Sequence, residues 1–330
     1  MTAGARRWLV TGGAGYIGAH VVRAFESAGI STVVLDDLST GLRARVPVSV
    51  PLIQANCADA ERVRQALDQY RCIGVVHLAA LKHARESSAQ PLRYWDNNLG
   101  AMLGVLKGLD GTSVAHFVLS SSCSIYGGAG AVDVASPPNP QSPYARTKVV
   151  CEQVLGDCAK LLGISWMTLR YFNVIGNDDF SAAHDTSPEC LVPATAARLA
   201  RGEPPVVYGT DFSTPDGTAL RDYVDVRDLA AAHLLAAQHL MNGKEGGMTL
   251  DVGSGSPISV LEVLSAIHEE FGQPLSFRDG ERNAADPDAV WAKATSVGTL
   301  LGWMPTHDLA SSIRAHVTAS GVGRSDGRLS

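Results

Sequence analysis

The stretch Trp8-Leu-Val-Thr-Gly-Gly-Ala-Gly-Tyr-Ile-Gly18 decides the fold of this chain. A short apolar run of strand type leads into a glycine-rich turn, and a helical pattern follows it. Gly13, Gly15 and Gly18 satisfy the G-x-G-x-x-G spacing in that context. Glycines let the backbone turn sharply and approach a pyrophosphate, toward which the first N–H groups of the helix point. The stretch predicts a dinucleotide-binding turn; a purely structural strand-to-helix turn is the alternative.

Apolar runs alternate with helical patterns over the first half of the chain. The predicted buried strands are Leu9–Thr11, Thr32–Asp36, Val75–Ala79, Phe117–Ser121 and Met167–Tyr171. The predicted helices are Ala19–Ala28, Ala60–Tyr70, Pro91–Leu109 and Tyr144–Leu162. This alternation predicts right-handed crossovers and an α/β fold with a doubly wound parallel (Rossmann) sheet.

The regular alternation ends after residue 173. Gly176–Pro193 is rich in Asp, Ser and Pro, which predicts a loop over the site, and Glu203–Tyr208 with later helices predicts a smaller mixed α/β C-terminal portion. We expect residues 1–175 to form the dinucleotide-binding domain, with a strand and helix of about 218–245 returning to it. The substrate-binding portion is expected at 176–217 and 246–318, and Ala319–Ser330 is expected to be a disordered tail.

The composition is that of an ordinary globular protein. The 330 residues are 45% apolar and 18% charged, and the net charge of −6 provides no basic field for a nucleic acid. The absence of a long apolar run and of a charged-then-apolar leader predicts a cytoplasmic protein with no membrane partner. The cysteines at 57, 72, 123, 151, 158 and 190 lack C-x-x-C spacing, which favours reduced thiols and predicts no metal site.

Asp36 ends the second predicted strand, 18 residues after Gly18. A carboxylate there can accept hydrogen bonds from both hydroxyls of an adenosine ribose, and it repels a 2′-phosphate. Asp37 adds to this repulsion, so NAD is favoured over NADP; an exposed acid in a turn is the alternative. Val75–Ala80 ends in small residues that let backbone lie against the cofactor, although ordinary strand packing explains the same run.

Tyr144 and Lys148 are four residues apart, hence on one face of a helix. A nearby ammonium and a cationic nicotinamide both favour a phenolate, so the pKa of Tyr144 is expected to fall toward the working pH. The hydroxyl-rich strand end Ser120–Tyr126 can hold a reacting oxygen against this tyrosine. The alternatives are a surface pair at 144 and 148, and a polar strand end that caps the next helix.

Taken together, these residues resemble the extended short-chain dehydrogenases/reductases, most closely the UDP-glucose (UDP-galactose) 4-epimerases. The resemblance runs from Leu9 to Trp303 and is carried by Val10–Gly18, Asp36–Gly41, His77–Lys82, Tyr94–Asn98, Ser120–Ser122, Pro140–Lys148, Arg170–Asn173 and Asp216–Tyr223. It implies an NAD-dependent isomerase of galactose metabolism that interconverts UDP-glucose and UDP-galactose, or close relatives, through a transient 4-keto sugar. It also implies that the NAD stays bound and is regenerated in each cycle.

The resemblance implies a role for each catalytic residue. Tyr144 would take the proton from the sugar 4-hydroxyl while hydride passes from C4 to NAD. Lys148 would hold the nicotinamide ribose and lower the Tyr144 pKa, and Ser122 would bond the 4-oxygen. The 4-keto sugar would then turn and receive the hydride on its other face. Relatives of this kind pair through the helices that correspond to Pro91–Leu109 and Tyr144–Leu162, which implies a homodimer.

The resemblance also implies the binding residues. Those for NAD are Gly12, Gly15, Tyr16, Ile17, Gly18, Asp36, Asp37, Leu38, Ser39, Thr40, Gly41, Asn56, Cys57, Leu78, Ala79, Ala80, Lys82, Asn97, Ser120, Tyr144, Lys148, Tyr171 and Phe172. Those for the nucleotide-sugar are Lys82, Ser122, Tyr144, Asn173, Cys190, Leu191, Val206, Tyr208, Arg221, Tyr223, Arg282 and Asp286. The Arg221 guanidinium also suits a diphosphate on chemical grounds; an ion pair with Asp222 or Asp225 is the alternative.

Four positions depart from the pattern of these relatives. Asn56 replaces an aspartate that binds the adenine amine, and Cys190 replaces a substrate-binding asparagine. The segment Arg282-Asn-Ala-Ala-Asp286 replaces Arg-Arg-x-Gly-Asp, so Asn283 stands where a second arginine clamps the pyrophosphate. Val290 lies where these relatives adjust the room around the sugar 2-substituent, and its size is compatible with an N-acetyl group. The departures leave open an unusual nucleotide-sugar as substrate.

Two other functions compete with epimerisation. A nucleotide-sugar 4,6-dehydratase carries an acidic pair beside the strand-end serine, whereas this chain has Cys123 and Ser124 there. A non-catalytic NAD-binding regulator on the same fold has no need of the tyrosine and the lysine, and this chain keeps Tyr144 and Lys148.

Overall fold

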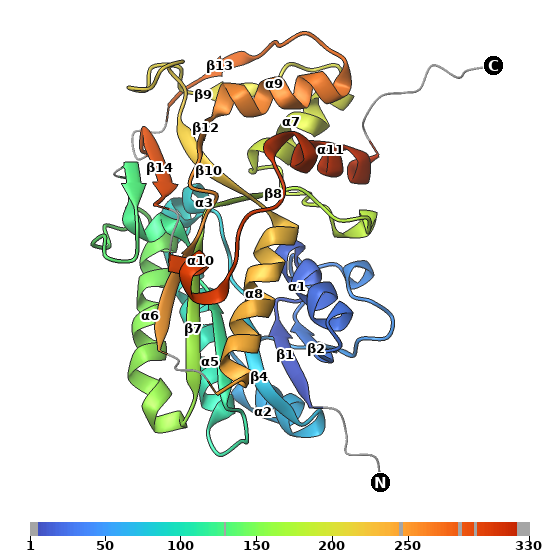
Figure 1. Ribbon diagram of the computed structural model, residues 1–330, viewed down its shortest axis with the longest axis vertical. Coiled ribbons are helices and arrows are strands. Elements are labelled where there is room, and N and C mark those ends of the chain that lie inside the picture. The colour runs from blue at the N-terminus through green and yellow to red at the C-terminus, as the bar shows by residue number, and fades with distance from the viewer. Residues whose placement is uncertain (1–5, 129, 244–246, 283–285, 294–295, 322–330) are drawn as a thin grey trace, which may run out of the picture.

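The computed structural model describes residues 6–128, 130–243, 247–282, 286–293 and 296–321. Figure 1 shows a large sheet with its helices in the lower part of the view and a smaller mixed portion above it. No helix among the residues so described is long and apolar enough to cross a membrane.

The large portion is built on a seven-stranded sheet in the order β11-β7-β5-β4-β1-β2-β3. Its strands are β1 (Arg7–Thr11), β2 (Thr32–Asp36), β3 (Leu52–Gln54), β4 (Cys72–His77), β5 (His116–Ser120), β7 (Ser165–Tyr171) and β11 (Met248–Val252). Every neighbouring pair in this order is parallel. The predicted doubly wound α/β fold is confirmed, with the five predicted strands at its centre and β3 and β11 added at its edges.

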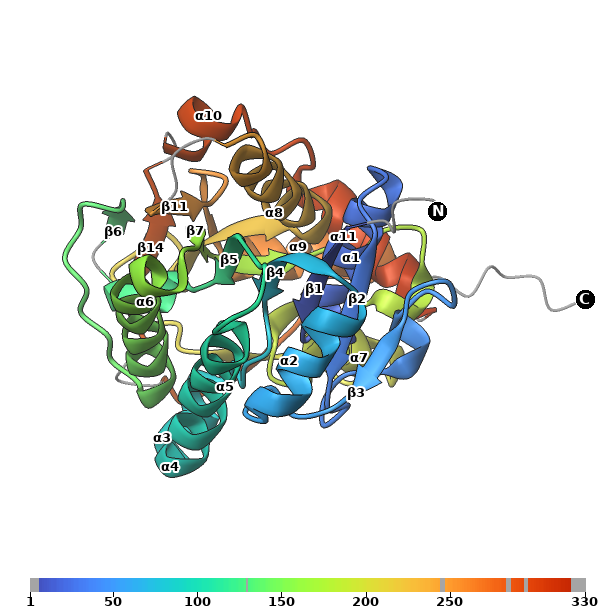
Figure 2. The same cartoon turned by 90° about the horizontal axis from the view of Figure 1, so that it is seen from below.

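Helices cover both faces of this sheet. They are α1 (Tyr16–Ser27), α2 (Ala60–Gln69), α5 (Gly100–Leu109), α6 (Pro143–Leu162), α8 (Val226–Met241) and α10 (Ser296–Leu301). Figure 2 shows α2, α5 and α6 on one side and α1, α8 and α10 on the other. Successive strand residues alternate between the two cores: Leu9 packs with Val63 and Met102, whereas Val10 packs with Val22 and Leu229.

The helix after the glycine turn begins at Tyr16, not at Ala19 as predicted. Gly15 is its N-cap, and Gly12 has φ +70°, a conformation that glycine adopts without strain. A Cβ on Gly18 would lie 2.2 Å from the Gly12 oxygen, so the first turn of α1 is pressed against the glycine turn itself. This close contact aims the start of α1 at the end of β1.

The region Pro91–Leu109, predicted as one helix, is a helix of changing type. It consists of α4 (Pro91–Tyr94), the π-helical turn η2 (Trp95–Leu99) and α5. A short helix, α3 (Ala84–Ala89), precedes it and was not predicted. A π turn widens the backbone locally, which the apolar spacing of the sequence does not report.

The smaller portion holds two further sheets. Its strands are β6 (Gly130–Val132), β8 (Asn173–Ile175), β9 (Val206–Tyr208), β10 (Leu220–Asp225), β12 (Pro257–Ser259), β13 (Arg278–Gly280) and β14 (Ala289–Ala292). One sheet has the order β12-β10-β14-β6 with β8 also paired to β10, and the other pairs β13 with β9. Its helices are α7 (Leu191–Ala200), α9 (Val260–Phe271) and α11 (Leu309–Ser320), which share a core around Val263 and Ile313.

Several expected boundaries differ from the structure. In the segment 218–245, α8 returns to the large sheet, but the strand β10 belongs to the smaller one. The strand that does return is β11, which was expected in the substrate-binding portion. Gly176–Pro193 contains the single turn η4 (Ser181–Ala183) and the start of α7. Of the expected tail Ala319–Ser330, residues 319 and 320 end α11, and 322–330 lie outside the described residues.

We expect Gly104→Ala to lower the free energy of unfolding by about 1–3 kcal/mol, because an added methyl group overpacks this site. Its Cβ would lie 2.2 Å from the Cys57 oxygen and 2.5 Å from the Ala58 Cα, and backbone atoms yield little. Gly156→Ala in α6 is the control, because nothing lies within 4 Å of its Cβ and alanine favours a helix by up to about 1 kcal/mol. Urea unfolding followed by circular dichroism measures both, and equal stabilities would contradict the packing argument.

Candidate active site

A cavity of about 350 Å³ opens where β1, β2 and β4 end. All the predicted NAD-binding residues line it except Leu38, Gly41, Ser120 and Phe172. The lining residues that the sequence did not predict are Arg45, Leu81, His83, Ala101, Asp185, Thr186, Ser187 and Pro188. Four of them, Asp185 to Pro188, belong to the loop that was expected to cover the site.

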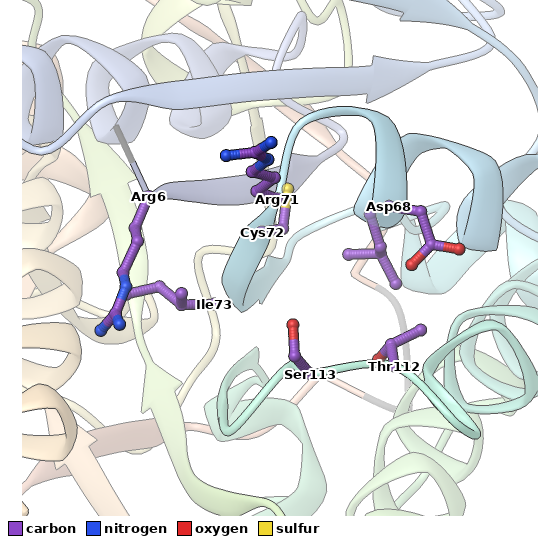
Figure 3. A pocket seen from close by; sticks show the side chains of 8 residues that line it. Arg6, Asp68, Arg71, Cys72, Ile73, Thr112 and Ser113 are labelled. Carbon is purple, nitrogen blue, oxygen red and sulfur yellow. The ribbon is translucent and has the colours of Figure 1, made fainter. Parts of the chain in front are cut away.

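A second hollow of about 420 Å³ lies at the opposite edge of the sheet, near the start of β1 and β4. Figure 3 shows that the guanidinium groups of Arg6 and Arg71 lie apart in it. Doubly wound sheets bind ligands at the carboxyl ends of their strands, and no predicted site residue lines this second hollow. The cavity at the glycine turn is therefore the candidate site.

The glycine turn is shaped to accept a phosphate. A Cβ on Gly12 would lie 2.7 Å from the Ala79 nitrogen, so the turn and the end of β4 already touch there. Gly15, the N-cap of α1, has no side chain to bond the first N–H groups of the helix. These groups and the positive end of the helix dipole face the cavity wall, an arrangement that suits a diphosphate. The residues present therefore fit a dinucleotide.

Asp36 lies at the adenosine end expected of such a ligand. Its Oδ2 accepts the Ala14 N–H and its Oδ1 accepts the Leu38 N–H, each at 2.9 Å. Burial raises the pKa of Asp36, and these two backbone hydrogen bonds oppose the rise. Gly41 approaches the same carboxylate, since its Cβ would lie 2.7 Å from Asp36 Oδ1. Leu38 and Gly41 thus shape the loop around Asp36 without lining the cavity.

Asn56 and Cys57 line the adenosine side of the cavity. The Asn56 amide donates to Asp37 Oδ2 at 3.3 Å, and its Oδ1 accepts the Ala58 N–H at 2.8 Å. Burial raises the pKa of the Cys57 thiol to about 12, so this residue is a neutral wall and not a nucleophile.

Tyr144 and Lys148 are both buried and both line the cavity, which excludes a surface pair. Ser142 caps α6 by accepting the Ala145 N–H, and Pro143 occupies the first helical position, so the helix begins immediately before Tyr144. The Ser122 hydroxyl lies beside the Tyr144 phenol and acts to lower its pKa. Ser122 thus joins the site through Tyr144, although it does not line the cavity.

Burial raises the pKa of Tyr144 well above its ordinary value, and the Ser122 hydroxyl only partly opposes the rise. The groups of the chain alone therefore do not produce the expected fall, which relied on a cationic nicotinamide as well as on the ammonium of Lys148. The Lys148 nitrogen lies 6.0 Å from the centre of the Tyr144 ring and donates to the Ser120 carbonyl at 2.9 Å. The lysine is therefore engaged with the strand end, and the chain's own residues keep the phenol protonated.

Ser120 supports the lysine from behind. It is fully buried, and its hydroxyl is 2.7 Å from His233 Nε2, while His233 Nδ1 is 2.9 Å from the Leu229 carbonyl. Burial lowers the pKa of His233 to about 4, so the ring is neutral at pH 7. Phe172 packs with Ile125 and Val290 in a small core. Ser120 and Phe172 therefore lie behind the cavity wall.

A buried polar network extends from the strand end beside Ser122. The Ser121 hydroxyl donates to Glu152, which pairs with Arg170 at 2.6 Å. Arg170 also donates to the Tyr126 hydroxyl at 2.8 Å. That hydroxyl donates to Asp251 Oδ1 at 2.7 Å, and Asp251 Oδ2 has no hydrogen-bond partner in the part of the chain described.

The substrate residues expected from the resemblance come from several elements of the smaller portion. Tyr223 and Asn173 are partners in β10 and β8, and Arg221 is the partner of Val290 in β14. The alternative for Arg221, an ion pair with Asp222 or Asp225, is not found among the described residues: Asp222 bonds the backbone at 254, 255 and 292, and Asp225 pairs with Arg227. Arg221 and Cys123 are close enough to interact electrostatically, which places Arg221 on the Ser122 side of the site.

Arg282 is held by two contacts of its own. Its guanidinium lies 3.8 Å from the centre of the Phe212 ring and pairs with Asp288 at 2.7 Å. Val206 and Tyr208 form β9 beside β13, Leu191 begins α7, and Cys190 is its N-cap without a side-chain hydrogen bond to the helix. Of the twelve expected substrate residues, Lys82 and Tyr144 line the cavity. Asn283 lies outside the described residues, and Asp286 borders that gap.

Known proteins share this arrangement. Residues 8–253 match the NAD dependent epimerase/dehydratase family. This chain belongs to that family. A UDP-glucose 4-epimerase from Azospirillum brasilense is 38% identical over 93% of this chain and 89% of its own. The extended short-chain dehydrogenase/reductase family predicted from the motifs is therefore confirmed.

Solved structures of the family agree over the whole fold. A UDP-glucose 4-epimerase from Brucella ovis in complex with NAD has a TM-score of 0.91 and 33% identity, over 96% of this chain and 99% of its own. One from Bifidobacterium longum in complex with NAD⁺ and UDP has a TM-score of 0.88 and 27% identity, over 96% and 98%. The predicted NAD cofactor and the predicted class of activity, a nucleotide-sugar 4-epimerase, are in accord with these relatives.

Asp251 makes the stability of this family member depend on pH. Burial raises its pKa to about 6 from an ordinary 3.8, so between about pH 4 and pH 6 the folded state binds a proton that the unfolded state has lost. The stability that this group contributes is present below about pH 4 and is lost as the pH rises through 6. Asp251→Asn keeps the acceptor for Tyr126 without the charge. We expect the free energy of unfolding of this variant to exceed that of the wild type by on the order of 2–3 kcal/mol at pH 7.5.

The measurement is urea unfolding of wild type and Asp251→Asn at intervals from pH 4.5 to 8. The difference in free energy of unfolding between the two proteins should be smallest at pH 4.5 and should reach its full size above pH 7. Asp157→Asn, an exposed acid on α6, is the control and should show no such trend. A difference that stays constant across this range would argue against an ionised buried carboxylate at 251.

Proposed function

We propose that this chain is an NAD-dependent 4-epimerase of a UDP-sugar, acting on UDP-glucose and UDP-galactose or close relatives. The observation that carries the proposal is the buried phenol of Tyr144, which lies beside Ser122 and lines the same cavity as the glycine turn and Lys148. NAD, when bound, accepts the hydride from the sugar C4 and returns it to the other face of the same carbon.

The residues of the chain supply the proton chemistry and the positioning. Tyr144 takes the proton from the sugar 4-hydroxyl. The Ser122 hydroxyl lies beside the Tyr144 phenol and orients the sugar 4-oxygen toward it. Because burial holds the Tyr144 pKa high, an added positive charge at the cofactor side is what favours ionisation. Lys148, fixed by the Ser120 carbonyl, positions the ribose of the cofactor. Asp36 accepts the adenosine ribose hydroxyls, which favours NAD over NADP.

A dehydratase is not supported. The residues after Ser122 are Cys123 and Ser124; burial raises the pKa of the Cys123 thiol to about 12, and neither side chain is a carboxyl group. An unusual nucleotide-sugar remains the second candidate because the Arg282 guanidinium is already paired with Asp288 and stacked on Phe212. The buried Val290 beside Arg221 is compatible with an N-acetyl group on the sugar.

Assembly and location stay predictions. We infer that two copies pair through the helical segment 91–109 and α6, and Leu92 in α4, which is 76% exposed, supports an apolar contact there. A cytoplasmic location and the lack of a nucleic-acid partner rest on the composition and charge of the chain.

We expect Tyr144→Phe to reduce turnover by at least about 10³-fold, because the variant cannot accept the proton of the 4-hydroxyl. Ser122→Ala should reduce turnover about 2- to 10-fold, since it removes the neutral hydroxyl that lies beside the phenol. Ser124→Ala is the matched control: its hydroxyl, two residues away, has no hydrogen-bond partner among the described residues. Proton spectra of UDP-galactose incubated with each NAD-loaded protein report inversion at C4.

The same samples decide between the alternatives. Product of unchanged mass supports epimerisation, whereas loss of water supports a dehydratase. Wild-type turnover that Tyr144→Phe leaves intact would refute the proposed role of the tyrosine, and no turnover of any UDP-sugar would favour a non-catalytic protein. NAD content is measured in every variant, so that loss of cofactor is not mistaken for loss of chemistry.

For the substrate side, we expect Arg221→Met to weaken the binding of UDP at least about 10-fold. A guanidinium on a diphosphate makes charge-assisted hydrogen bonds worth about 1.5–3 kcal/mol. Arg282→Met, which removes a cation already paired with Asp288, is the comparison variant and should lower UDP affinity less than Arg221→Met does. Titration calorimetry of the NAD-loaded proteins with UDP measures both. A larger effect at 282 than at 221 would reverse the assignment of the diphosphate contact.

A further inference from the structure

Arg45 is a buried cation that none of the proposed steps uses. It ends η1 (Arg43–Arg45), a short turn in the connection between β2 and β3, and only 4% of its surface is exposed. Arg45 lines the cavity on the same side as Asp36 and Asp37. Arginine is rarely buried without a partner, so the surroundings of this guanidinium call for a physical explanation.

The partners of Arg45 all belong to the segment that covers the site. Its Nη2 donates to the His184 carbonyl at 2.8 Å and to Thr186 Oγ1 at 3.4 Å, and its Nε donates to the Ala182 carbonyl at 3.3 Å. η1 and η4 pack against each other, and Figure 1 shows the yellow-green covering segment beside the blue part of the chain. One side chain thus ties residues 182–186 to the loop that follows Asp36.

The charge of Arg45 is not neutralised by a direct ion pair. No carboxylate of the described residues lies within 4 Å of it, and burial lowers the pKa of its guanidinium. Asp185 and Asp36, together with the Tyr16 hydroxyl, oppose that effect from a greater distance. Nη1 has no hydrogen-bond partner among the described residues, so two N–H groups of the forked guanidinium remain available as donors. A buried cation of this kind is stabilised by an anion that enters the cavity.

The covering segment has other ties at its two ends. Arg23 in α1 pairs with Asp178 at 2.6 Å, and His83 Nδ1 lies 3.1 Å from Glu189 Oε2. Arg45 holds the stretch between them, at the adenosine end of the cavity. Loss of Arg45 therefore frees the middle of the segment while both ends remain fixed.

We propose that Arg45 is a positioning residue for the bound dinucleotide. It fastens residues 182–186 over the adenosine half of the cavity, its charge offsets the nearby carboxylates for the anionic ligand, and both effects slow the release of NAD. The proposal rests on the NAD-dependent function proposed above and not on the identity of the sugar.

The test compares Arg45→Met and Arg45→Lys with Arg43→Met. Arg43 lies two residues away on η1, is exposed, and contacts the Val46 carbonyl of its own loop. Each protein is loaded with radiolabelled NAD, and label retained after addition of excess unlabelled NAD gives the dissociation rate. We expect release to be at least 10-fold faster in Arg45→Met, about threefold faster in Arg45→Lys, which keeps the charge but not the fork, and unchanged in Arg43→Met.

Two further readouts separate positioning from a merely structural role. Hydrogen exchange of the NAD-loaded proteins should be faster in the peptide that covers residues 181–187, with β1 and α1 unaffected. Turnover of Arg45→Met should fall on dilution and recover when NAD is added. If Arg45→Met does not fold, Arg45→Lys carries the same comparison.

Equal dissociation rates in the wild type and both Arg45 variants would overturn the inference. So would turnover lost on dilution that added NAD does not restore. Wild-type protein that retains no labelled NAD would overturn the proposed function together with this inference. Retention of NAD without turnover of any UDP-sugar would refute the sugar assignment. The role of Arg45 would then be decided by the NAD dissociation rates alone.

Discussion

The site depends on a contact between two stretches of main chain. Gly12 approaches Ala79 so closely that a Cβ would lie 2.7 Å from the Ala79 nitrogen, and Gly18 presses the first turn of α1 onto Gly12. This contact fixes the ends of β1 and β4 and the start of α1 around one point. Lys82 follows β4 by a few residues, and the strand order β4-β1-β2 brings Asp36 to the other side of the same point. A methyl group at either glycine would force these elements apart and would open the cavity.

Charge in the site is arranged in two layers. The wall of the cavity includes Tyr144 and Cys57, which burial keeps neutral, beside the charged Asp36, Lys82 and Arg45. Behind the wall, charged groups satisfy one another, as Glu152 and Arg170 do. Lys148 spans the two layers, since it lines the cavity while its nitrogen bonds the Ser120 carbonyl. The chain thus sets the positions of the reacting groups in advance and leaves the final change of charge at Tyr144 to the ligands.

The sequence predicted those parts of the fold and of the site that are formed by residues close together in the chain. The buried strands of the large sheet are continuous apolar runs, and the glycine turn, Asp36 and the pair at 144 and 148 lie within or next to those elements. The β3 and β11 edge strands were missed or misplaced because they are short or partly exposed, so their apolar signal is weak. The strand β10 reads like any other strand; which sheet it joins is decided by distant partners such as Ala289 and Ser259.

The same reasoning explains which site residues the sequence missed. Asp185 to Pro188 come to the cavity from a loop whose path no periodicity specifies, although its place over the site was expected. Arg45 could not be recognised as a site residue from the sequence, because an arginine in a polar connection resembles a solvated surface residue until its contacts with 182–186 are known. The Tyr144 pKa was expected to fall because a nearby ammonium and a cationic nicotinamide both favour the phenolate. The structure shows that Lys148 is held by Ser120 and that burial has the larger effect.

The π-helical turn at Trp95–Leu99 has a consequence for how this region tolerates change. Asn97 lines the cavity, whereas the adjacent Asn98 is buried, accepts the Leu81 N–H and donates to Thr147 on α6. A π turn carries one more residue than an α-helical turn, and that additional residue helps two consecutive amides to serve different neighbours. Removal of a single residue between 95 and 99 would restore regular winding and rotate one asparagine away from its partners. Natural variants of this enzyme should therefore accept substitutions in this turn more readily than changes in its length.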